Sequence, residues 1–227
     1  MYLISKYFLY FIIYSFIGWA MEVICKLFEQ KRFINRGFLI GPICPIYGYG
    51  VLAIVLLIGN STQDILAVFL KAILVCSILE YFTSYIMEKL FSARWWDYSK
   101  KKFNINGRIC LETMIPFGLL GCFVIYIAHP FVIHIVSYLS PTITSCLSIL
   151  LFIVYLIDNI ISFNVLNKIK KEIKKQELDS TERIRKQVLE WIDANSYIYR
   201  HIKSAFPKFK IHTKLSKFKN KPNERNE

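Results

Sequence analysis

The chain has 227 residues, of which 55% are hydrophobic and 16% aromatic, and it carries a formal net charge of +13. This composition is too apolar for a soluble domain of that length, so part of the chain must be solvated by lipid. The positive charge does not indicate nucleic-acid binding, because the sequence contains no recognisable nucleic-acid-binding module.

Five apolar segments are each close to the ~20 residues that cross a hydrocarbon core. The sequence therefore predicts an all-α, polytopic transmembrane helix bundle that occupies residues 1–163. We expect the first segment to be an uncleaved helix, because no small-x-small cleavage site precedes the charged loop at Lys26. The predicted spans are residues 3–25, 41–59, 65–90, 109–128 and 142–163.

The loops between these spans alternate in charge, which predicts the topology. Lys and Arg are frequent in the first and third loops and absent from the second and fourth. Because short loops rich in Lys and Arg stay in the cytoplasm, we expect a multi-pass protein of the cell membrane with its N-terminus outside and its C-terminus in the cytoplasm. The basic residues are Lys26, Lys31, Arg32 and Arg36 in the first loop, and Arg94, Lys100, Lys101, Lys102 and Arg108 in the third.

Glycine and proline interrupt the start of the second span. Proline lacks a backbone donor and glycine loosens the backbone, so the free peptide groups must be satisfied by protein or water. One interpretation is a broken or re-entrant segment, as found at transporter binding sites; the other is a Pro-initiated helix with small residues for tight packing. We favour the first. The residues concerned are Gly37, Gly41, Pro42, Pro45 and Gly48.

Ionisable side chains inside a span cost about 2.5–3.5 kcal/mol at the bilayer centre, so each needs a partner or a function. In the predicted topology Glu22, Glu112 and Asp158 lie within about two turns of the cytoplasmic boundary, and Glu80 lies roughly 12 Å inside. Helix-end pairing with arginines would explain the boundary carboxylates, whereas Glu80 is too deep to reach water easily. The candidate polar site comprises Glu22, Arg36, Glu80, Glu88, Asp97, Arg108 and Glu112.

The third loop places Trp and Tyr side chains at headgroup depth, where an aromatic belt accounts for them. An aromatic belt does not explain Asp97, which lies between aromatic residues, or the Asn-x-Asn-Gly sequence immediately before Arg108. These features predict a folded cap over the cytoplasmic face.

Residues 164–227 contain 17 Lys and Arg against 8 Asp and Glu, a net charge of +9. We expect a basic, helical cytoplasmic tail over residues 164–207, with a capping box at 179–182 that begins a second helix. The Lys-rich and Asn-rich end, 208–227, is expected to be disordered. The tail has two interpretations: a solvated helix pair, or a surface that binds anionic lipid or a partner.

The sequence predicts no cofactor and no metal site, since its six cysteines form no C-x-x-C pair and no zinc-ligand spacing. His129 and His134 are expected on the outer side, away from the carboxylates. No Ser–His–Asp grouping and no H-E-x-x-H motif is evident, so we do not expect an enzyme.

Several blocks resemble, in order, the family of small bacterial membrane proteins called ABC-transporter type IV, or CmpB-like. The resemblance covers about residues 8–130, and it implies a permease. The matching blocks are 14–19 (YSFIGW) with Glu22, 35–39 (NRGFL), 41–42 (GP), 45–48 (PIYG), 79–81 (LEY) with Ser84 and Glu88, 95–99 (WWDYS), 103–104 (FN) and 107–109 (GRI).

Two functions remain open. The first is a permease-like component of a transport system, with a polar site in the cytoplasmic half of the bundle. The chain has no G-x-x-x-x-G-K-[ST] loop, so a separate ATPase subunit or self-association would be needed. The alternative is a membrane scaffold or regulator that recruits a partner through its basic tail.

Overall fold

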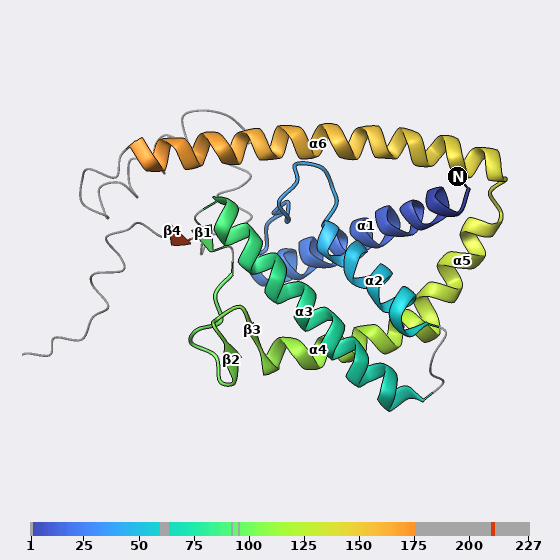
Figure 1. Ribbon diagram of the computed structural model, residues 1–227, viewed down its shortest axis with the longest axis horizontal. Helices are drawn as coiled ribbons and strands as arrows, with labels where there is room; N and C mark the ends of the chain where they lie inside the picture. Colours follow the sequence, from blue (N-terminus) through green and yellow to red (C-terminus); the bar gives the residue numbers. More distant parts are fainter. Residues whose placement is uncertain (1, 60–63, 92, 95, 176–209, 212–227) are drawn as a thin grey trace, which may run out of the picture.

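The computed structural model describes the chain except for residues 1, 60–63, 92, 95, 176–209 and 212–227. The described part is almost entirely helical (Figure 1). The helices are α1 (Tyr2–Gln30), α2 (Pro45–Ile58), α3 (Ile65–Phe91), α4 (Leu111–Phe123), η1 (Val124–Ala128), α5 (His129–Ser137) and α6 (Pro141–Lys175), and the strands are β1 (Ala93–Arg94), β2 (Asn104–Ile105), β3 (Ile109–Cys110) and β4 (Lys210–Ile211).

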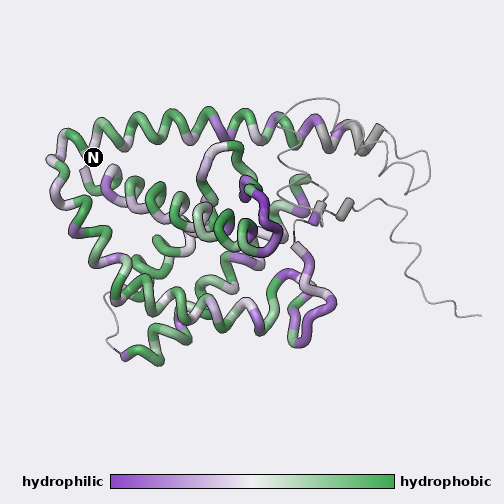
Figure 2. The backbone as a smooth tube through the Cα atoms, turned by 180° about the vertical axis from the view of Figure 1, so that it is seen from behind, coloured by the Kyte–Doolittle hydropathy of each residue, from purple (hydrophilic) through white to green (hydrophobic). Residues whose placement is uncertain are grey.

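Four helical segments of the described chain are long and apolar enough to cross a membrane. They are Tyr2–Gln30, Ile65–Phe91, Leu111–Ser137 and Pro141–Lys168, and the shorter apolar helix Pro45–Ile58 lies among them. The predicted all-α membrane helix bundle is therefore confirmed. The hydrophilic stretches of the described chain gather toward the end of the bundle where the connections 31–44 and 92–110 lie (Figure 2).

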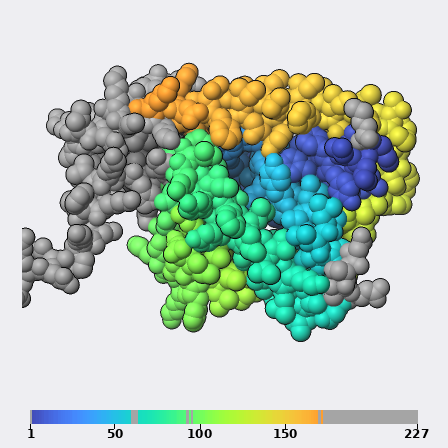
Figure 3. Space-filling model, in the orientation of Figure 1, coloured from blue at the N-terminus to red at the C-terminus, as the bar shows by residue number. Residues whose placement is uncertain are grey.

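The bundle is held together by an apolar core between its helices. α3 packs most extensively on α4 and α1 on α2, and α6 lies along α1. Figure 3 shows α6 as a ridge along one edge of the molecule. Large apolar side chains of α6, such as Leu150 and Val154, are exposed, as expected for a surface that faces lipid. The core includes Leu9, Tyr14, Ile54, Val68 and Val132.

The second span differs from its predicted range of 41–59, because only Pro45–Ile58 is helical. Residues 31–44 run as irregular chain to the middle of α1, where the Cys44 N–H donates to the Ser15 carbonyl at 2.9 Å. Pro45 at the first helical turn explains why the helix begins there. Gly48 lies so close to α1 that a β-carbon would meet Ser15 and the Phe11 carbonyl. The Pro45 start and the close Gly48 contact fit the Pro-initiated helix, whereas the irregular chain over residues 31–44 is what the broken or re-entrant interpretation expects, and that interpretation stays a prediction.

The fourth span extends beyond its predicted end at residue 128, because α4, η1 and α5 form one helical segment up to Ser137. The pair His129-Pro130 follows the predicted end directly, and proline lacks the N–H that a regular helix uses. The structure places a π-helical turn, Val124–Ala128, immediately before this pair, and the helix continues through it.

The connection from α3 to α4 forms a folded cap (residues 93–110). β2 and β3 pair antiparallel, and the turn between them contains Asn106 (φ 52°) and Gly107 (φ 66°). Two consecutive residues with positive φ are typical of Asn-Gly hairpin turns. β1 pairs with β4 from the distant tail. Apart from that strand and the part of the tail within α6, the predicted tail and its disordered end lie outside the described residues.

Candidate functional site

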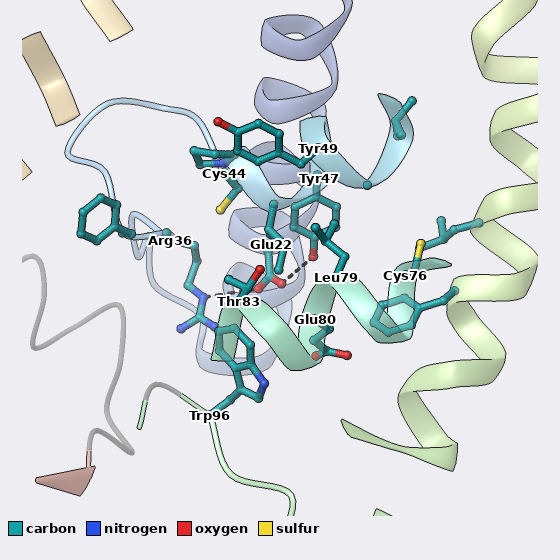
Figure 4. Close-up of a pocket in the computed structure, with 18 of the residues that line it drawn as sticks. Glu22, Arg36, Cys44, Tyr47, Tyr49, Cys76, Leu79, Glu80, Thr83 and Trp96 are labelled. Carbon is teal, nitrogen blue, oxygen red and sulfur yellow. Dashed lines mark hydrogen bonds and ion pairs between the residues drawn. The ribbon is translucent and has the colours of Figure 1, made fainter. Parts of the chain in front are cut away.

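A cavity of about 430 Å³ lies in the half of the bundle next to the cap. Its walls come from α1, the re-entrant segment (residues 31–44), α2, α3, α4 and the cap, and they are mostly apolar. Figure 4 shows that polar groups from separate elements reach this space. Its polar lining residues include Glu22, Arg36, Tyr47, Glu80, Trp96 and Tyr98.

Glu22 of α1 has one partner in the first loop and one in α2. The Tyr47 hydroxyl donates to Glu22 Oε1 at 2.7 Å, and Arg36 Nε lies 3.4 Å from Glu22 Oε2 (Figure 4). The carboxylate thus connects α1 to the re-entrant segment and to the first turn of α2. Its charge is balanced by Arg36, which agrees with the arginine pairing expected from the sequence.

Glu80 of α3 has no comparable partner. It is 9% exposed, and among the described residues its carboxylate accepts a hydrogen bond from the Tyr98 hydroxyl, which lies 3.4 Å from Oε1. Oε2 is buried without a hydrogen-bond partner among the described residues. Within the same part of the chain, no Lys or Arg lies within ion-pair distance of this side chain. Glu80 is therefore a buried cavity carboxylate without a countercharge from the described residues.

Glu88, two turns further along α3, belongs to an ion-pair cluster in the cap. Its Oε2 lies 2.8 Å from Arg108 Nη2 and 3.2 Å from Arg94 Nε, and Arg94 Nη1 lies 3.6 Å from Asp97 Oδ1. Arg108 also donates to the Ser84 hydroxyl at 3.2 Å. The structure thus brings together Glu88, Asp97 and Arg108 from the predicted site, and their charges are mutually satisfied.

The cap also closes over the cavity. Trp96 Nε1 donates to the Arg108 carbonyl at 3.0 Å, which connects the cavity wall to the ion-pair cluster. Burial raises the pKa of the Tyr98 hydroxyl, and the neighbouring Glu80 carboxylate acts in the same direction. Tyr98 therefore stays protonated at neutral pH and can donate to Glu80.

The re-entrant segment is held by a carboxylate from α6. Asp158 Oδ1 accepts the Ile40 N–H and Oδ2 accepts the Gly41 N–H, each at 3.0 Å. Unpaired peptide groups at membrane depth are costly, so this side chain stabilises the irregular backbone. Asn35 adds a second anchor by donating to the Ile40 carbonyl at 2.8 Å.

Glu112 and the histidines lie elsewhere. The Glu112 side chain is 62% exposed and pairs with Lys101 on the surface, at 2.7 Å, so it does not line the cavity. His129 is buried beside Tyr14, with Nδ1 3.3 Å from the Tyr14 hydroxyl, and does not contact the cavity carboxylates. Among the described residues, no group of three or more His, Cys, Asp or Glu is arranged to hold a metal ion.

Tyr47, Tyr98 and the re-entrant contacts of Asp158 were not predicted as parts of the site. The two tyrosines lie inside the blocks that carry the family resemblance, which was the available signal. The acceptors of Asp158 are backbone groups more than a hundred residues away, and no side-chain pattern reveals such a pairing.

The four long apolar helices and the shorter helix among them define a polytopic helical membrane protein. Residues 9–163 match the model of the family described as "Putative ABC-transporter type IV", and the chain belongs to this family. The description indicates transport rather than catalysis. Comparisons with curated proteins and with solved structures give no match.

Proposed function

We propose that the protein is the permease-like membrane component of a transport system, and that the cavity next to the cap is its substrate site. The observation that carries this proposal is Glu80, a buried carboxylate in the cavity wall without a countercharge among the described residues. An intramembrane carboxylate costs about 2.5–3.5 kcal/mol on insertion scales, so one that makes so few contacts calls for a function.

The neighbouring charges support this interpretation by contrast. Glu88 and Glu22 each lie within ion-pair distance of an arginine, as expected of carboxylates that fix helix ends and loops. Glu80 makes no such pair in the described chain, and the irregular segment 31–44 forms part of the same cavity wall. Irregular backbone at membrane depth commonly lines binding sites in transporters.

Coupling to ATP would require another protein. The sequence contains no G-x-x-x-x-G-K-[ST] phosphate-binding loop, so we propose a separate ATPase subunit as the partner. Self-association is a second way to complete a pathway, because the described spans are few.

The test compares the small-molecule contents of cells that express the wild-type chain, Glu80→Gln or Glu112→Gln from the same vector. We expect wild type and Glu112→Gln to change the cellular level of the same solutes, and Glu80→Gln to abolish that change at equal expression. Glu112→Gln is the matched control, since its carboxylate lies on the surface. A solute profile that is identical in wild type and Glu80→Gln would contradict the proposal.

A further inference from the structure

The chemical class of the substrate can be inferred from the walls of the cavity. Besides Glu22 and Glu80, they consist mainly of aromatic and aliphatic side chains contributed by α1, α2, α3, α4, η1 and the two connections. The aromatic side chains are Phe38, Tyr47, Tyr49, Trp96, Tyr98 and Phe117. A space of this kind suits a ligand with a substantial apolar surface.

The charges around the cavity are not balanced. Glu22 is matched by Arg36, which also lines the cavity. Arg108 of the cap is engaged by Glu88 and by the hydroxyl of Ser84, which lies one turn beyond Glu80 on α3. Glu80 has no basic partner among the described residues, and its Oε2 is buried there without a hydrogen-bond partner. The lining therefore presents one carboxylate that a ligand can satisfy.

The same features argue against other ligand classes. An anion would face the Glu80 carboxylate. A metal ion would need several ligands around it, and the described residues contain no group of three or more His, Cys, Asp or Glu that could hold one. A cation with an apolar body, by contrast, gains from both the carboxylate and the aromatic faces, since aromatic rings attract desolvated ammonium groups.

We propose that the cavity binds an organic cation, an amine or quaternary ammonium with an apolar body, whose charge is neutralised by Glu80. This inference rests on the proposed function, because it names the substrate class of the same site. Tyr98 serves as a positioning residue, since its hydroxyl donates to Glu80 Oε1, while Oε2 has no hydrogen-bond partner among the described residues.

The test measures binding of benzyltrimethylammonium to the purified full-length protein in lipid nanodiscs by calorimetry. We expect saturable binding to the wild type, at least tenfold weaker binding to Glu80→Gln, and unchanged binding to Glu112→Gln. Benzenesulfonate, an anion of similar size, should not bind. Thr83→Trp fills the cavity and leaves every charge in place, so it should also weaken binding at least tenfold. This second variant keeps the test valid if Glu80→Gln does not fold.

Three results would overturn the inference: no binding of the cation to wild type, equal binding to the wild type and Glu80→Gln, or equally tight binding of benzenesulfonate. Cation binding does not depend on transport, so the two proposals can fail separately. Absence of cation binding together with a Glu80-dependent solute change refutes only the substrate class. Glu80-dependent cation binding without any solute change supports the inference and refutes the transport function.

Discussion

Glu80 and Glu88 lie two turns apart on α3, and their surroundings show how differently two carboxylates of one helix can be used. Glu88 is held by Arg94 and Arg108 in the cap, whereas Glu80 faces the cavity with the Tyr98 hydroxyl as a hydrogen-bond donor. The first arrangement stabilises the fold, and the second leaves the Glu80 carboxylate without a basic partner among the described residues.

Glu88→Gln should destabilise the protein by about 2 kcal/mol, because it removes the partner of two arginines, and an unpaired buried charge is costly. Arg108 is only 8% exposed and cannot be fully rehydrated in the folded protein. Thermal unfolding in detergent measures the effect. Glu112→Gln, which breaks the exposed pair with Lys101, should lower the stability by less than about 1 kcal/mol. Equal losses of stability in the two variants would be inconsistent with the ion-pair cluster in the cap.

Tyr98 should make stability sensitive to alkaline pH. Burial raises the pKa of its hydroxyl in the folded state, so its contribution is complete below the ordinary value of about 10 and is lost as the pH rises above it. We expect the free energy of unfolding of the wild type to fall more steeply between about pH 9 and 11 than that of Tyr98→Phe, by up to about 1 kcal/mol at the upper end, and thermal unfolding at each pH checks the difference. Parallel curves for the two proteins would show that Tyr98 is not buried as described.

At the scale of elements, the start of α2 packs closely against α1. Gly48→Ala should destabilise the protein by about 1–3 kcal/mol, because the added β-carbon meets Ser15 and the Phe11 carbonyl. Gly50→Ala, two residues further, meets only Leu79 at 3.6 Å and should be neutral or gain up to about 1 kcal/mol from helix propensity. Thermal unfolding of the two variants checks the order, and the reverse order would rule out this packing.

The elements also show what could be predicted from the sequence. Apolar length was sufficient to locate the helices, and the Gly and Pro residues between Gly37 and Gly48 indicated irregular chain. Exact helix ends were less accessible, because Pro130 follows a π-turn instead of ending the helix. Topology predicted arginine partners for the boundary carboxylates, and Glu22 lies within ion-pair distance of Arg36. The depth of Glu80 in the membrane stays a prediction. The outward position of Glu112 did not, since it depends on how the first turn of α4 is rotated toward Lys101.

At the scale of the whole molecule, the connections 31–44 and 92–110 lie at the same end of the bundle, as the charge alternation requires (Figure 1). We expect this end to face the cytoplasm. Green fluorescent protein fused after residue 227 should fluoresce in cells, and a cysteine at position 62 should react with an impermeant maleimide added outside. Labelling at position 62 only in inverted vesicles would show that the orientation is the opposite one.

The most direct test of a cytoplasm-facing polar cavity is the reactivity of a single cysteine in its wall. Thr83→Cys, in a chain whose native cysteines are replaced by alanine, should react with an impermeant maleimide in inverted vesicles several times faster than Phe82→Cys. Thr83 lines the cavity, whereas the neighbouring Phe82 is 55% exposed on the apolar surface of the bundle. Equal reactivity at the two positions, or labelling of Thr83→Cys only from the outside, would contradict the presence of such a cavity.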